Sequence, residues 1–146
     1  MPPHAVNAYF HPFRNEIVFP AGILQPPMFD AEADDALNYG GIGMVIAHEI
    51  THAFDDQGRR FDASGAFRDW WTAEDNEKFK QKAAGLVKQY GSYEALPGLN
   101  VNGELTLGEN IGDLSGAAVA YAAYVASLNG AEGPVIDGFT GRQRFF

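Results

Sequence analysis

Apolar residues at helical spacing predict a long helix in the first half of the chain. Asp35 or Asn38 can cap its start, and the pattern continues to about residue 54. Apolar side chains recur here every fourth residue, so they share one face of an α-helix. That face should turn toward the core, and its members are Ile42, Ile46, Ile50 and Phe54.

Two later stretches have the same helical spacing. Thr72 with Asp75 should open the first, and Gly91 should close it. Its predicted buried positions are Phe79, Ala83, Leu86 and Tyr90. The second runs from Thr106 to about Leu128, and small side chains on one face permit close approach of another helix. These small residues are Gly112, Gly116 and Ala120.

Strand-like stretches are confined to the N-terminal part of the chain. Residues 7–10 and 16–19 are rich in aromatic and β-branched side chains, and residues 11–15 between them carry turn formers. Prolines make the passage over residues 21–29 extended, and glycine-containing loops should separate the three helices. The pattern therefore predicts an α+β, mainly helical domain with a small sheet.

Composition narrows the classes of function. The chain has 146 residues, enough for one domain over residues 1–146, and 46% of them are hydrophobic. A formal charge of −9 argues against non-specific nucleic-acid binding. No apolar run approaches the ~20 residues of a membrane span. Because cysteine is absent, a metal site must use histidine and carboxylates.

The C-terminal segment, residues 140–146, predicts the opening of a fourth helix. Its last two residues, Phe145 and Phe146, would be two large apolar side chains without a partner. We therefore expect a fragment that is incomplete at its C-terminus. Its expected partner is the remainder of the same protein, either in the same polypeptide or as a second polypeptide. The N-terminus carries no signal-peptide pattern.

The motif His48-Glu49-Ile50-Thr51-His52 lies within the first predicted helix and has the H-E-x-x-H pattern. Residues four apart stand one turn above each other, so both imidazoles can reach one metal ion. Glu49 lies about 100° around the helix, where its carboxylate can act on a metal-bound water. The alternative is an amphipathic helix with two surface histidines.

Two carboxylates in the third predicted helix can complete such a site. Glu109 can supply a third ligand, and Asp113, one turn further, can accept the free N–H of a ligand histidine. The alternatives are a capping box, with Glu109 bonded to Thr106, and a solvated Asp113. For Asp55 and Asp56, just beyond the motif, we favour a plain helix-end loop.

Several motifs together resemble the neprilysin and endothelin-converting-enzyme family from residue 6 to residue 146. They are Val6–Phe10, Asn15–Pro27, Gly40–Gly43, His48–Asp56, Asp69–Trp71 and Leu107–Asp113. The resemblance implies a thermolysin-like zincin catalytic domain that is incomplete at both ends, because the family's N-terminal helical domain and C-terminal segment lie outside this sequence. It also implies one zinc ion with His48, His52 and Glu109 as ligands, Glu49 as general base, and Asp113 as the residue that orients a ligand histidine.

The resemblance further implies how a peptide would bind. Asn7 and Ala8 match the family's edge strand, which pairs with the substrate backbone. A hydrophobic pocket beside the zinc is implied for four residues, each of which could instead be a plain core residue: Ile23, Met28, Met44 and Val45. Met28 stands where phenylalanine is usual, which leaves the side-chain preference open.

The function implied is that of an exported zinc-dependent endopeptidase, which hydrolyses small peptides on the amino side of apolar residues. A histidine and an arginine that contribute to catalysis in the family lie beyond the position of Phe146, outside this sequence. The alternative is therefore a zinc-binding but weakly active or inactive fragment with a structural or binding role.

Overall fold

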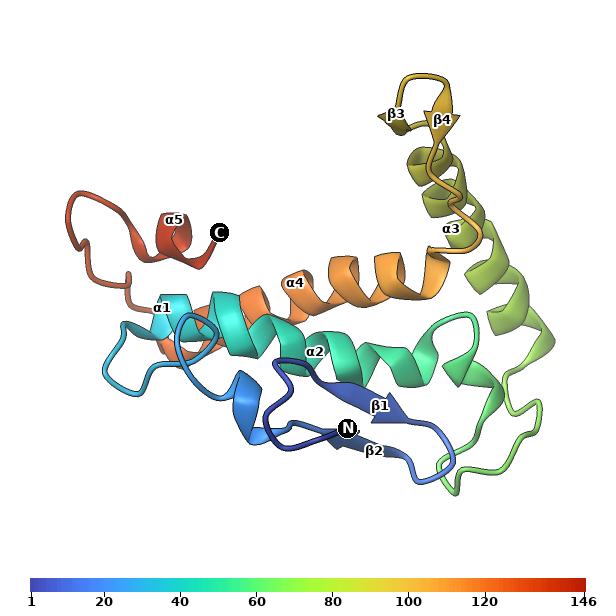
Figure 1. The fold of residues 1–146 in the computed structure, drawn as a ribbon, viewed down its shortest axis with the longest axis horizontal. Helices are drawn as coiled ribbons and strands as arrows, with labels where there is room; N and C mark the ends of the chain where they lie inside the picture. The colour runs from blue at the N-terminus through green and yellow to red at the C-terminus, as the bar shows by residue number, and fades with distance from the viewer.

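Two antiparallel helices, α2 (Met44–Thr51) and α4 (Leu107–Ser127), form the centre of the molecule, and every residue from 1 to 146 is described by the computed structural model. The two helices lie side by side in Figure 1 and make the most extensive contact between any two elements. Their closeness depends on the small-residue stripe of α4. A Cβ atom at Gly116 would lie 3.0 Å from the backbone nitrogen of His48 and from the carbonyl oxygen of Met44.

The first predicted helix is one continuous helical path with changing pitch. It comprises α1 (Asp35–Asn38), a π-helical turn (Tyr39–Gly43), α2, and a 3₁₀ turn (His52–Phe54). Asp34 is its N-cap, one residue before the predicted start.

The prediction of a buried isoleucine stripe is wrong for most of its members. Ile42 is buried, but Ile46, Ile50 and Phe54 are 38%, 48% and 49% exposed. The face of α2 that packs on α4 instead carries Ala47 and His48, because the glycines of α4 let the backbone of α2 approach there.

Helix α3 (Ala73–Gly91) begins as predicted, with the Thr72 side chain accepting a hydrogen bond of 3.1 Å from the Asp75 backbone N–H. The residues predicted to be buried in this helix are each partly buried, and none is fully buried: Phe79, Ala83, Leu86 and Tyr90. Beyond it lies a hairpin of β3 (Glu94–Leu96) and β4 (Leu99–Asn100), where a loop was expected. Gly98 has a φ of +76° in the turn, which favours glycine.

The C-terminal helix α5 (Gly141–Phe145) begins with a capping box between Thr140 and Gln143. The expectation that both terminal phenylalanines lack a partner is wrong for Phe145, which is 7% exposed and packs on Tyr121 and Tyr124. Phe146 is 80% exposed. The buried core is small and consists of Ala36, Ala47, Ala120, Tyr124 and Phe145.

The N-terminal hairpin joins β1 (Tyr9–His11) to β2 (Glu16–Val18) in antiparallel register, with Tyr9 opposite Val18. Each strand has a single neighbour, so one edge of β1 remains unpaired. The hairpin lies along α2 (Figure 1). None of the helices combines the length and the apolar character required to cross a bilayer.

Candidate metal centre

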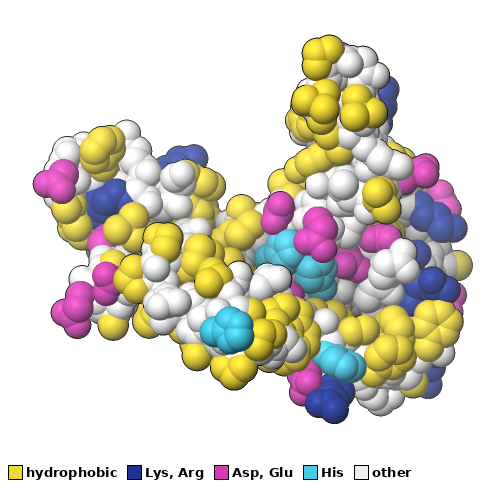
Figure 2. Space-filling view, in the orientation of Figure 1, with side chains coloured by type: hydrophobic (Ala, Val, Ile, Leu, Met, Phe, Trp, Pro, Cys, Tyr) yellow, Lys and Arg dark blue, Asp and Glu magenta, His cyan; other side chains and the backbone are white.

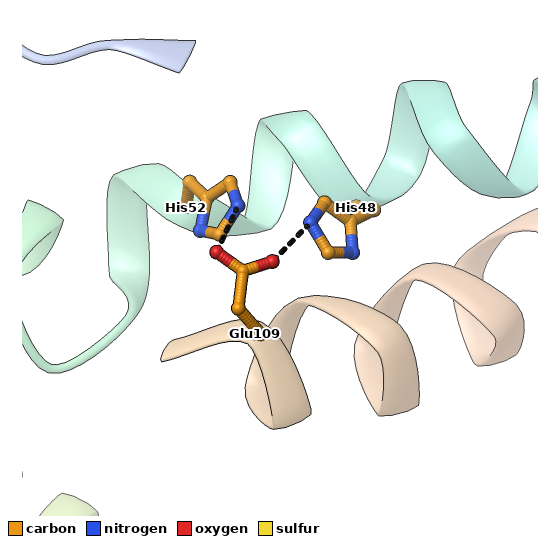
Figure 3. A group of neighbouring side chains, drawn as sticks. All are labelled: His48, His52 and Glu109. Atoms are coloured by element: carbon orange, nitrogen blue, oxygen red, sulfur yellow. Dashed lines mark ion pairs between the residues drawn. The ribbon is translucent and has the colours of Figure 1, made fainter. Parts of the chain in front are cut away.

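Three side chains converge where the end of α2 passes the start of α4 (Figure 3). The Nε2 atom of His48 lies 3.3 Å from Oε2 of Glu109, and Nε2 of His52 lies 3.9 Å from Oε1 of the same carboxylate. The two imidazole centroids are 4.5 Å apart. One donor atom from each of the three residues can be chosen so that all lie within 4.8 Å of one another.

The position of the His48 ring depends on a glycine in the facing helix. A Cβ atom at Gly112 would lie 2.8 Å from Cε1 and Nδ1 of that ring. Real Cβ atoms do not approach a ring so closely, so any other residue would displace the imidazole. The stripe predicted for helix packing thus also makes room for a candidate metal ligand.

Both histidines are oriented by a carboxylate on the far side of the ring. Nδ1 of His48 lies 2.9 Å from Oδ1 of Asp113, and Nδ1 of His52 lies 2.7 Å from Oδ2 of Asp55. A carboxylate can only accept, so each pair favours a protonated Nδ1 and leaves the Nε2 lone pair directed at the shared centre.

The interpretation of Asp55 as a plain loop residue is wrong. Its side chain is buried, and its Oδ1 accepts hydrogen bonds from the backbone N–H groups of Gln57, at 2.8 Å, and Gly58, at 2.6 Å. The loop after the 3₁₀ turn therefore folds around this carboxylate and holds it against His52. The only signal in the sequence is an acidic residue three positions after the motif, with a glycine, Gly58, three positions further on.

The capping-box alternative for Glu109 does not occur. The Thr106 side chain makes no capping bond to α4; its hydroxyl accepts from Nδ2 of Asn110 at 2.8 Å and donates to the Asn102 carbonyl at 3.2 Å. The carboxylate of Glu109 is thus free to turn toward the histidines, as Figure 3 shows.

Burial and hydrogen bonds together set the electrostatics of the centre. Desolvation raises the pKa of Glu49 above its ordinary value, against the lowering effect of His52 and His48, and its Oε2 is buried without a hydrogen-bond partner. The hydrogen bond to Asp55 raises the pKa of His52. Burial alone would raise the pKa of Asp55, but hydrogen bonds from His52, Gly58 and Gln57 together lower it.

The donor set fits a zinc ion. Two ligands at ~2.0–2.1 Å from a tetrahedral zinc lie roughly 3.3–3.4 Å from each other. The separation between His48 and Glu109 matches this value, and that between His52 and Glu109 needs only a small side-chain adjustment. Two neutral imidazoles and a carboxylate leave a fourth position open, as in catalytic zinc sites.

A cavity of about 420 Å³ opens over the three side chains. Besides His48, Glu49, His52 and Glu109, its walls include residues 7–10. Asn7 and Ala8 precede β1 rather than belonging to it; Asn7 is exposed, and Ala8 is buried. Figure 2 shows histidine and acidic side chains gathered in the middle of this face.

The other four predicted pocket residues do not line this cavity. Ile23 is buried elsewhere, and Met44 packs against the core of α2, α4 and α5. Met28 lies in the loop beneath the π-helical turn, where its carbonyl accepts from the Ile42 N–H at 2.9 Å, and Val45 is half-buried. Their role in substrate binding stays a prediction.

A mainly helical α+β fold with an H-E-x-x-H helix and a downstream glutamate defines the zincin class of metallopeptidases. The sequence model of Peptidase family M13 matches residues 7–146. The chain therefore belongs to this family of zinc metallopeptidases, and the predicted family and fold class are confirmed.

Individual relatives agree with this assignment. Endothelin-converting enzyme 1 from Bos taurus is 53% identical over 149 residues, which cover 100% of this chain and 20% of that protein. Neprilysin from Homo sapiens is 54% identical over 121 residues, covering 82% of this chain and 16% of its own length. The crystal structure of the Mycobacterium tuberculosis zinc metalloprotease Zmp1 with an inhibitor is similar at a TM-score of 0.95 and 54% identity, over 98% of this chain and 23% of that one. The chain spans a fifth or less of these curated relatives.

Proposed function

We propose that this chain carries the zinc centre of a zinc-dependent endopeptidase, with His48, His52 and Glu109 as ligands. The observation that supports this most directly is the convergence of the two Nε2 atoms on one carboxylate. Both Nδ1 atoms are meanwhile tied to Asp113 and Asp55. A surface histidine pair without a metal would not need this arrangement.

Glu49 is the proposed general base. Bound zinc supplies Lewis acidity, which lowers the pKa of a coordinated water. The Glu49 carboxylate would take up a proton from that water and return it to the leaving amine. Burial favours this role of Glu49, because it raises the pKa of the carboxyl group. A carboxyl group with a raised pKa can both accept and release a proton more readily.

The proposed substrate is an extended small peptide. Residues 7–10 line the cavity, and the free edge of β1 offers hydrogen-bonding groups that an added strand can use. Asn7 and Ala8, which line the same cavity as Glu49, would contact the peptide next to the scissile bond. Family membership supports the proposed cleavage on the amino side of apolar residues and the proposed export of the protein.

The test is zinc-dependent hydrolysis by the full-length protein that contains this chain. A fluorogenic peptide with phenylalanine after the scissile bond should be cleaved, and a matched peptide with aspartate there should be cleaved more slowly. Cleavage should stop on chelation and return when zinc is added. Full activity in metal-free protein would overturn the proposal, whereas bound zinc without hydrolysis of any peptide would favour the alternative of an inactive zinc-binding module.

A further inference from the structure

A second cavity, of about 280 Å³, adjoins the cavity over the metal centre. The two share four lining residues: Phe10, Pro12, Gly58 and Phe61. Four further residues line the second cavity only: Ala53, Phe54, Ala63 and Trp70. The cavity over the metal centre and the second, aromatic cavity therefore adjoin each other at the four shared residues.

The walls of this aromatic cavity are held in place by contacts within the chain. The turn between β1 and β2 packs on the loop that follows α2: Nδ2 of Asn15 donates to the Ala63 carbonyl at 3.3 Å. The Phe13 and Phe61 rings meet edge to face at 5.1 Å. Nε1 of Trp70 donates to the Phe61 carbonyl at 2.9 Å. The cavity is thus formed without a ligand, as binding pockets usually are.

The chemistry of the lining selects a neutral, apolar occupant. Phe54 is 49% exposed and Trp70 is 45% exposed, so aromatic surface is available for contact. The charged residues of the lining, Arg68 and Asp62, pair with each other at 2.6 Å and leave no net charge to attract an ionic group. A hydrophobic side chain would gain contact with the rings, whereas a charged one would lose water without a partner.

We propose that the aromatic cavity is a substrate subsite, which takes an apolar or aromatic side chain two to four residues from the scissile bond. Side chains on one face of an extended peptide recur every ~6.6–6.8 Å. In a peptide laid along β1, the second or fourth residue from the scissile bond would therefore place its side chain past Phe10, toward the aromatic cavity. Because the two cavities share four lining residues, a peptide bound over the metal centre would pass directly beside the aromatic cavity, and this adjacency commits the occupant to the peptide itself. This inference rests on the proposed peptidase activity.

The experiment uses the full-length protein and pairs of reporter peptides that differ only in having phenylalanine or alanine at one position. The changed position is scanned from the second to the fourth residue on each side of the scissile bond. At one of these positions phenylalanine should raise kcat/KM roughly 10-fold, the low end for filling a hydrophobic pocket. A ratio close to one at every position would overturn the proposal.

A filling variant links the preference to this cavity. Ala63→Phe places a ring at an exposed lining position and should reduce the phenylalanine preference to nearly one, while zinc content stays unchanged. Ala66→Phe is the matched control, because Ala66 is exposed in the same loop but does not line the cavity. Equal effects of the two variants would contradict the assignment.

Two other outcomes are distinguishable. If no reporter is cleaved in a zinc-dependent way, the proposed function itself has failed. If cleavage is normal, phenylalanine gives no preference, and Ala63→Phe lowers the melting temperature while Ala66→Phe does not, another segment of the protein fills the cavity. That result would overturn the subsite.

Discussion

Gly112 of α4 lies directly against the imidazole of His48 in α2, with room for a hydrogen but not for a methyl group. The same glycine therefore allows the two helices to pack and leaves the ring free to point at Glu109. The packing of α2 on α4 and the position of the candidate metal ligand His48 therefore both depend on the absence of a side chain at Gly112.

The first prediction follows from this contact. Gly112→Ala should weaken zinc binding, because its Cβ would stand 2.8 Å from the His48 ring and displace it. Zinc affinity measured by competition with a chromophoric chelator should fall by roughly 10-fold or more, since misplaced ligands lose affinity on that scale. The control is Gly85→Ala in α3, where a Cβ meets nothing within 4 Å. That variant should keep its zinc and gain about 0.5–1 kcal/mol of stability.

A second prediction concerns the ligands themselves. His48→Ala and Glu109→Ala should each lose stoichiometric zinc by elemental analysis after dialysis, because two remaining ligands hold the ion too weakly. Glu104→Ala removes an exposed carboxylate just before α4 and should retain zinc. Full zinc occupancy in both ligand variants would show that the metal is held elsewhere.

Glu49→Gln separates metal binding from catalysis. The amide preserves the shape of the side chain but cannot take a proton at neutral pH, so the full-length variant should keep its zinc. Its kcat should fall by at least the ~10²–10⁴-fold typical of a lost general base. More than a tenth of normal activity would assign proton transfer to another group.

Asp55→Asn tests the carboxylate that the motif does not include. The amide keeps an acceptor for the N–H groups of Gln57 and Gly58 but can present an NH₂ group to Nδ1 of His52. Two donors cannot pair, so His52 should turn to the tautomer that lacks an Nε2 lone pair. Zinc affinity should fall by ~10–100-fold. Asp35→Asn, at an exposed site in α1, should leave affinity unchanged.

The hydrogen-bonded pair of Asp55 and His52 predicts a pH dependence of stability for the metal-free chain. The pKa of His52 is raised from 6.5, so its contribution to stability is complete below that pH and is lost as pH rises through the folded-state value. The pKa of Asp55 is lowered from 3.8, so its contribution is complete above that pH and is lost as pH falls through the folded-state value. The pair therefore stabilises the chain most between pH 3.8 and 6.5.

Thermal unfolding in EDTA can measure this effect. The difference in melting temperature between the unsubstituted chain and Asp55→Asn should be larger at pH 5 than at pH 8.5, both conditions chosen around His52's ordinary value of 6.5. An equal difference at both values would show that the charge on His52 contributes nothing to the pair.

Local sequence determined much of this protein. The four-residue spacing of His48 and His52 places both rings on one helix face whatever the surroundings, because the helical repeat alone decides it. The starts of α3 and α5 follow from threonine caps that act over three residues. The small-residue stripe of α4 predicted a close helix contact for the same local reason, since it needs only regular spacing.

The tertiary structure decided what spacing could not. The isoleucine stripe of α2 has the right period for a core face, but only the partner helix determines which face is covered, and α4 covers another. Asp55 supports His52 because the following loop turns its N–H groups inward, and Phe145 is buried because two tyrosines of α4 reach it. Burial and electrostatics depend on residues distant in the chain, so they are properties of the packed molecule and not of any segment of it.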